Sequence, residues 1–188
     1  MEYGFIFDYD GVLINSMEIH YKANVITLGE IEVPMDKQRY FSQAGMTGVE
    51  QIRSFCEAAG VTADYEALYS HKKEVFRTML DEVTRIERNL EFYNTLISGG
   101  VKVAVATGCS RETLEITSEL LDIYVPVSVC GAEVRRGKPS PDLFLEAARL
   151  LELEPLKCTV VEDSDVGAEA AAAAGMACLR FYDRVQKG

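Results

Sequence analysis

Short apolar runs recur along the chain, and a group of polar residues follows each one. The five clearest runs cover residues 3–7, 101–106, 125–129, 158–161 and 177–181. Runs of this length that are apolar throughout are typical of strands buried on both faces, as in a parallel sheet between two helical layers. The pattern therefore predicts strands of a parallel sheet.

Segments with helical signals separate these runs. Ser110 precedes one segment, Pro141 stands at the first predicted position of another, and Gly175 ends an alanine-rich segment. Strands and helices alternate from about residue 89 onwards, so right-handed crossover connections are expected. The predicted fold class is α/β, with a parallel sheet in a Rossmann-like three-layer core.

Residues 15–85 follow a different pattern, with at least three helical segments and no convincing strand. Thr47 and Glu50 match a capping box, and the apolar residues from Tyr65 to Leu80 keep helical spacing. We expect a small α-helical cap at residues 15–85, inserted after the first strand. Residues 1–14 and 86–188 would then form the Rossmann-like core domain.

Charge and composition narrow the function. The 188 residues fit one domain with a small insertion, and thirty acidic against nineteen basic residues give a net charge of −11. This balance argues against nucleic acid or an anionic membrane as a partner. Five scattered cysteines and two histidines offer little for a disulfide framework, a zinc site or a histidine triad. We expect a cytoplasmic monomer without a signal peptide or membrane span.

Two carboxylates follow the first predicted strand. Asp8 and Asp10 are two residues apart, so in extended backbone both face the same site. They repel each other unless a cation lies between them, and carboxylate oxygens suit Mg²⁺. One acid could act as a nucleophile while the other transfers protons. A polar turn at Gly11 would explain the same residues.

Three further polar groups lie at later strand ends or before a helix. Thr107 and Gly108 could hold an anion at a helix N-terminus, although a helix cap explains such residues equally well. Lys138, between Gly137 and Pro139, is either a fixed cation or a surface lysine. The acids 162 and 163 could complete a metal site or form an acidic turn. Together with the first acid pair, these groups all follow a strand or precede a helix. That shared placement favours a single phosphate-binding site over four unrelated turns or caps.

In these four groups the sequence resembles the haloacid dehalogenase superfamily, whose motifs are D-x-D-G, Ser or Thr, Lys and a terminal acid pair. The resemblance covers essentially the whole chain. It is strongest for the β-phosphoglucomutase-like branch with a small helical cap, and within it for sugar-phosphate phosphatases such as fructose-1-phosphate phosphatase. It implies a Mg²⁺-dependent phosphatase whose substrate is a small phosphorylated sugar or polyol.

The resemblance also assigns roles to residues. Asp8 would form an aspartyl-phosphate, and Asp10 would act as the general acid and base. Thr107, Gly108 and Lys138 would bind the phosphoryl group, while Asp8, the Asp10 carbonyl, Glu162 and Asp163 would hold Mg²⁺. His20, Thr47 and Lys72 would contact the substrate from the cap, although His20 could also be a half-buried helix residue and Lys72 a solvated one.

One departure from the mutase pattern bears on the reaction. Mutases of this branch carry a cap arginine after Gly and a hydroxyl residue, whereas Thr47 is followed here by Gly48. Without that arginine a bisphosphate is harder to retain, so we expect hydrolysis. A phosphosugar mutase and a non-catalytic metal- or phosphate-binding module remain as alternatives. The role of Cys109, beside the Thr-Gly pair, stays open.

Overall fold

The computed structural model describes residues 2–181 of the chain. The elements of the first half, in chain order, are β1 (Gly4–Phe7), β2 (Ile14–Asn15), α1 (Met17–Gly29), α2 (Lys37–Ser42), α3 (Gly48–Ala58), α4 (Tyr65–Arg77), η1 (Leu80–Glu82) and β3 (Thr84–Arg85). The remaining elements are α5 (Glu87–Ser98), β4 (Lys102–Thr107), α6 (Arg111–Leu120), β5 (Ser128–Cys130), η2 (Gly131–Glu133), α7 (Asp142–Leu150), η3 (Pro155–Lys157), β6 (Cys158–Glu162), α8 (Asp165–Ala173) and β7 (Ala177–Arg180).

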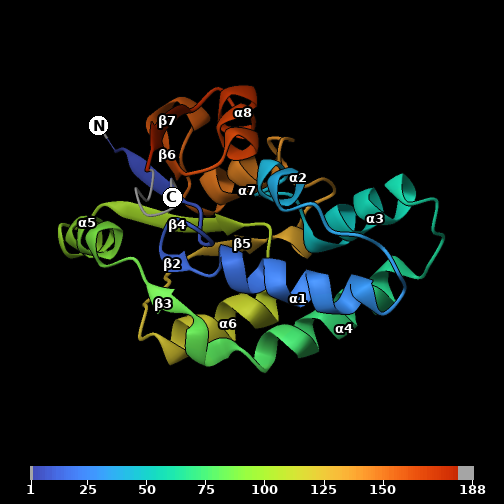
Figure 1. Cartoon of the computed structure of the whole chain (residues 1–188). Coiled ribbons are helices and arrows are strands. Elements are labelled where there is room, and N and C mark those ends of the chain that lie inside the picture. Colours follow the sequence, from blue (N-terminus) through green and yellow to red (C-terminus); the bar gives the residue numbers. More distant parts are fainter. Residues whose placement is uncertain (1, 182–188) are drawn as a thin grey trace.

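Five strands form one parallel sheet in the order β5-β4-β1-β6-β7 (Figure 1). β1 lies at the centre, with Gly4 opposite Lys102 on β4 and Cys158 on β6. The outer pairs β4–β5 and β6–β7 are also parallel. All five carboxyl ends therefore lie at one edge of the sheet, where ligands of open α/β sheets bind. The predicted α/β Rossmann-like class is confirmed.

Alternate residues of the strands face two helical layers. Phe7 and Val161 lie on the face covered by α5 and α6, whereas Ile6 and Ala104 lie on the face covered by α7 and α8. The buried residues of α8 are small, so this helix packs close to the sheet. Burial on both faces explains why these strands are apolar throughout rather than alternating.

Some predicted boundaries were wrong by a few residues. The run 125–129 forms a strand only at Ser128–Cys130, and Pro126, which lacks an N–H, lies in the part that stays irregular. α7 begins at Asp142, with Pro141 as its cap residue. The pattern missed β2 and β3, a two-residue antiparallel pair in which Ile14 lies opposite Arg85. Strands of only two residues are too short to show a detectable alternation of apolar and polar positions.

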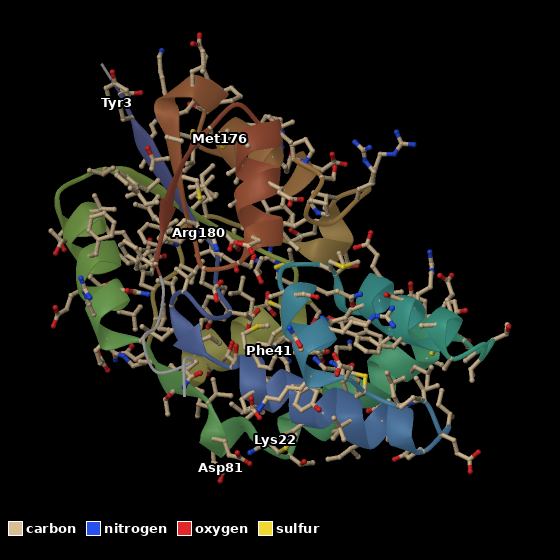
Figure 2. All side chains as sticks on the ribbon, turned by 45° about the horizontal axis from the view of Figure 1, so that its top comes forward. Tyr3, Lys22, Phe41, Asp81, Met176 and Arg180 are labelled. Atoms are coloured by element: carbon tan, nitrogen blue, oxygen red, sulfur yellow. The ribbon has the colours of Figure 1, made fainter. Side chains whose placement is uncertain are left out.

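Helices α1–α4 form a separate group beside the carboxyl edge of the sheet, called the helical cap below (Figure 1). They bury their own apolar cluster, which includes Leu28, Ile52 and Phe55. Phe41 of α2 lies over α1, where its ring contacts Tyr21 with centroids 6.2 Å apart (Figure 2). Strands β2 and β3 pair where the chain leaves and re-enters the core.

The division of the chain at residues 15 and 85 stays a prediction, and residues 182–188, which it assigns to the core, lie outside the described residues. Within residues 2–181, no helix has both the length and the apolar character needed to cross a membrane.

Candidate active site

Asp8, Lys138 and Glu162 form a buried ion-pair group at the carboxyl edge of the sheet. The Lys138 ammonium lies 2.8 Å from Asp8 Oδ1 and 2.7 Å from Glu162 Oε1. Their exposures are only 3%, 1% and 0% for residues 8, 138 and 162. Gly137 and Pro139 flank the lysine, and the Lys138–Pro139 peptide bond is cis. Lys138 is therefore a fixed internal cation and not a surface residue.

The electrostatics of this group follow from burial. Burial raises the pKa of Asp8 well above its usual value, Lys138 opposes that rise, and the nearby acids Glu162 and Asp163 add to it. Burial also disfavours charge on Lys138, but Asp8 and Glu162 more than compensate and raise its pKa. Lys138 thus faces three acids, Asp8, Glu162 and Asp163, so the group keeps an excess of negative charge that a further cation could neutralise.

The acid pair after β6 has two distinct environments. Both oxygens of Glu162 have partners, because Oε1 lies beside Lys138 and Oε2 accepts hydrogen bonds from the backbone N–H (2.7 Å) and hydroxyl (2.9 Å) of Ser164. Asp163 is half-buried, and burial beside Glu162 raises its pKa to about 7. Arg180 at the end of β7 fixes this loop by donating to the Asp163 carbonyl at 2.8 Å (Figure 2).

Asp8, Glu162 and Asp163 could hold a divalent cation. One oxygen from each lies within 4.8 Å of the others. Gly11 permits this convergence, because a Cβ there would stand 2.4 Å from Asp163 Oδ2. An all-oxygen donor set with excess negative charge fits Mg²⁺. Glu162 already has partners on both oxygens in Lys138 and Ser164, so Asp8 and Asp163 are the acids better placed for direct coordination.

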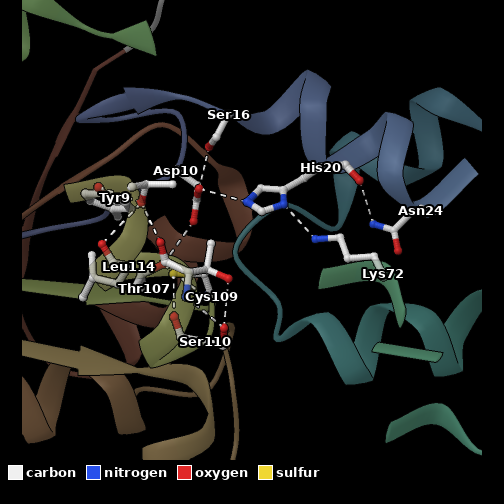
Figure 3. Close-up of polar contacts among 12 residues, drawn as sticks. Tyr9, Asp10, Ser16, His20, Asn24, Lys72, Thr107, Cys109, Ser110 and Leu114 are labelled. Atoms are coloured by element: carbon white, nitrogen blue, oxygen red, sulfur yellow. Dashed lines mark hydrogen bonds and ion pairs between the residues drawn. The ribbon is translucent and has the colours of Figure 1, made fainter. Parts of the chain in front are cut away.

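Asp10 is held by three hydrogen bonds (Figure 3). Its Oδ1 accepts from the Ser16 hydroxyl at 2.5 Å and lies 3.2 Å from His20 Nε2, and its Oδ2 accepts from the Thr107 hydroxyl at 3.2 Å. Burial alone would raise the pKa of Asp10, but His20 and Ser16 outweigh it and lower the value to about 2. Asp10 is therefore ionised in this state.

His20 and Lys72 extend this network into the cap. The Lys72 ammonium lies 2.7 Å from His20 Nδ1, and the imidazole stacks on Phe76 with centroids 4.0 Å apart. An ammonium can only donate, so Nδ1 accepts and the proton of neutral His20 lies on Nε2, facing Asp10. Burial and Lys72 lower the pKa of His20, and burial lowers that of Lys72 to about 8. The cap thus orients Asp10.

The loop after β4 brings Thr107, Gly108 and Cys109 to the same place. The Cys109 N–H donates to Thr107 Oγ1 at 3.1 Å. A Cβ on Gly108 would stand 2.6 Å from the Met46 carbonyl, so glycine permits the cap loop to touch the core here. Burial raises the pKa of the Cys109 thiol well above its usual value, so Cys109 is a poor nucleophile.

A cavity joins these groups at the boundary between cap and core. The residues that line it are Asp8, Asp10, Met17, His20, Tyr40, Ala44, Gly45, Met46, Gly48, Gln51, Tyr69, Lys72, Thr107, Gly108 and Cys109. Six of the ten predicted site residues are therefore on its wall, while Lys138, Glu162 and Asp163 are not on it and lie close to Asp8. Thr47 is not on this wall; it caps α3 and accepts a hydrogen bond from the Glu50 N–H.

Several residues of this site have no recognisable sequence pattern. Ser16 gives no signal, because a lone serine before a helix is usually only a cap residue. Tyr40, Gln51 and Tyr69 lie on three different cap helices, and their approach to one cavity depends on how those helices pack. Spacing along the chain cannot reveal it.

Sequence and structure comparisons identify relatives. Residues 5–181 match the family model described as haloacid dehalogenase-like hydrolase. The chain is 32% identical to a phosphorylated carbohydrates phosphatase of Thermotoga maritima, covering 91% of this chain and 81% of that protein. It is 32% identical to a fructose-1-phosphate phosphatase of Escherichia coli, covering 92% and 93%.

Among solved structures, a hydrolase from Pseudomonas syringae superposes with a TM-score of 0.88 at 24% identity, covering 98% of this chain and 89% of that one. At that identity the likeness shows the fold alone, whereas the match to the family model spans almost all of the described residues. The chain belongs to the haloacid dehalogenase-like hydrolase family.

Proposed function

We propose that this protein is a Mg²⁺-dependent phosphatase that hydrolyses a small phosphorylated sugar or polyol through an aspartyl-phosphate on Asp8. The observation that carries the proposal is the pair Asp8 and Asp10 on one cavity wall, the first ion-paired with buried Lys138 and the second hydrogen-bonded to His20. The pair supplies a nucleophile and a proton-transfer group side by side. The phosphatases similar to this chain support the substrate class.

Each proposed step uses a group on this wall. An Asp8 oxygen attacks phosphorus, the bond from phosphorus to the substrate oxygen breaks, and Asp10 gives that oxygen a proton. A water then attacks phosphorus, Asp10 takes its proton, and phosphate leaves as Asp8 is freed. Asp10 is ionised without substrate, and an adjacent phosphoryl dianion would raise its pKa and allow it to be protonated for the first step.

Positive charge is the other requirement of phosphoryl transfer, because catalysis depends mainly on positioning and charge neutralisation. Lys138 supplies one fixed charge beside Asp8, and Thr107 and Gly108 offer a hydroxyl and a backbone N–H. Mg²⁺ held by Asp8, Asp163 and the Asp10 carbonyl, with Glu162 nearby, would supply the remaining positive charge. The cap domain that we propose, residues 15–85 with helices α1–α4, would select the substrate and close the cavity to water.

Hydrolysis is favoured over a mutase reaction by the start of α3. Gly48 stands there without a side chain, so no cation reaches the cavity from that position. Lys72 does reach it but is hydrogen-bonded to His20. Lys72 is the one lysine or arginine among the residues that line the cavity, so a second phosphate would meet a single ammonium already shared with His20 and no guanidinium.

The test is a panel of phosphate monoesters with Mg²⁺, with chelator, and with the Asp8→Asn variant. We expect phosphate release from sugar or polyol monophosphates that disappears with chelator and with Asp8→Asn. Activity surviving in Asp8→Asn would contradict the covalent mechanism. Conversion of a sugar 1-phosphate to its 6-phosphate without net phosphate release would support a mutase instead. Mg²⁺ binding without turnover of any ester would indicate a binding module.

A further inference from the structure

The first turn of α3 and the middle of α4 meet at an unusually close contact. Gly48 begins α3, and a Cβ at this position would stand 2.1 Å from Cε2 and 2.7 Å from Cδ2 of Tyr69. Only a residue without a side chain therefore allows the Tyr69 ring to lie where it does. Ser110, at the N-cap of α6 in the core, also interacts with the Tyr69 side chain.

Tyr69 lies between two cavities. It lines the catalytic cavity together with Asp8 and Asp10, and it also lines a second cavity between cap and core. The catalytic cavity has a volume of about 60 Å³ and the second about 300 Å³. Gly48, Gly108 and Cys109 also belong to both walls, but Tyr69 is the one large side chain that the two walls share.

The second cavity differs from the first in charge as well as in size. Its wall carries Arg53 and Arg135 together with Glu50 and Glu66, so opposite charges balance there. It lacks the excess of positive charge that an anionic group would need. The part of a substrate that entered this cavity would therefore be selected by its size, and a second phosphate on it would find no favourable charge there.

We propose that Tyr69 is a specificity-determining residue that limits the length of the group esterified to phosphate, so that the enzyme accepts short, neutral polyol or sugar monophosphates. This inference rests on the proposed function. In-line transfer places the leaving oxygen on the side of the phosphoryl group away from Asp8, towards the cap residues of the cavity wall. Tyr69 is the large cap side chain common to the walls of this cavity and the second one, and Gly48 leaves room for its ring.

The kinetic test compares two probe esters, glycerol 3-phosphate as the short one and 4-methylumbelliferyl phosphate as the bulky neutral one. For Tyr69→Ala we expect the ratio of kcat/KM for the bulky ester to that for the short ester to rise at least tenfold over wild type. Tyr69→Phe keeps the ring and should change the ratio less than twofold. An unchanged ratio in Tyr69→Ala, or an equal rise in Tyr69→Phe, would overturn the proposal.

Tyr65→Ala is the matched control, because Tyr65 opens the same helix and lines neither cavity. It should leave the ratio within twofold of wild type; a rise as large as that of Tyr69→Ala would mean that general loosening of the cap, and not the missing wall, admits the larger ester. Tyr69→Leu provides a better-packed truncation if Tyr69→Ala folds poorly, and it should move the ratio in the same direction.

A second measurement does not depend on turnover. Gly48→Ala should lower the melting temperature of the wild-type protein, because the new methyl group meets the Tyr69 ring, but should cost little in the Tyr69→Ala background. Equal losses in both backgrounds would contradict the assigned contact. If the wild type hydrolysed no ester at all, the proposed function and the size limit would both fail, while this stability comparison would still report on the contact.

Discussion

Lys138 offers the sharpest test of how the core of the site is built. In Lys138→Met the side chain keeps much of its volume, but the buried carboxylates of Asp8 and Glu162 lose the cation that lies 2.8 and 2.7 Å away. Removing one partner of a buried ion pair costs about 3–5 kcal/mol, because the remaining charge is left without compensation. For a protein of this size, that loss lowers the melting temperature by roughly 6–20 °C.

The sign of the pH dependence follows from Asp8. Its folded-state pKa is already raised, and loss of Lys138 raises it further, so the variant regains stability relative to wild type as the pH falls towards the ordinary value of 3.8. Thermal unfolding followed by circular dichroism at pH 7.5 and pH 5, with and without Mg²⁺, measures this. The deficit should be largest at pH 7.5 without Mg²⁺ and should shrink at pH 5 or with Mg²⁺.

The control is Lys157→Met, a lysine with 43% side-chain exposure that lies 3.9 Å from Glu154. Exposed pairs contribute about 0–1 kcal/mol, so this variant should melt close to wild type at both pH values. The reasoning would be refuted if Lys138→Met melted within 2 °C of wild type at pH 7.5 without Mg²⁺, or if its deficit were the same at pH 5.

Three further predictions concern single side chains. Asp163→Asn removes a carboxylate whose pKa is raised from 3.8 to about 7. Without metal at pH 8 this variant should therefore be about 2–4 kcal/mol more stable than wild type in chemical unfolding, and added Mg²⁺ should no longer stabilise it. A less stable variant would contradict this prediction. In the wild type the proton competes with the cation for Asp163, so calorimetry should show Mg²⁺ affinity falling about tenfold per pH unit below 7; an affinity independent of pH would exclude Asp163 as a ligand. Lys72→Met should raise the pKa of His20 in an NMR titration, because Lys72 helps to lower it, whereas Lys73→Met should leave it unchanged.

The sequence predicts the strands of the core and the helical character of residues 15–85 well, but not how the cap helices pack, for physical reasons. Strands buried on both faces are apolar throughout, so the five strands are visible as runs, and acids placed directly after them must meet at one edge. Asp8, Asp10, Thr107 and Lys138 could therefore be predicted as site candidates before their geometry was known. The capping box at Thr47 is a local pattern and was confirmed as well.

The features that the sequence does not reveal depend on packing between helices. Thr47 stays a predicted substrate contact; it caps α3 and lines the second cavity and not the one that holds Asp8 and Asp10. Tyr69 was recognised only as one apolar position of a helix, although it separates two cavities. Its position is set by the missing side chain of Gly48, twenty-one positions earlier and on another helix. Contacts of that kind leave no periodic signal.

The central claim is that Asp8 carries the phosphoryl group during turnover. Asp10→Asn lacks both the proposed acid of the first step and the proposed base that activates water. With a phosphate donor whose leaving group needs no proton, such as acetyl phosphate, only the second step should be blocked, so a phosphorylated enzyme should accumulate. The measurement is acid quenching of Asp10→Asn mixed with ³²P-labelled acetyl phosphate and Mg²⁺, followed by peptide mapping. The account predicts label on the peptide that contains Asp8, released by hydroxylamine and absent from the double variant with Asp8→Asn. Phosphate release from the wild type without label at Asp8 in Asp10→Asn, or label that persists when Asp8 is replaced, would contradict it.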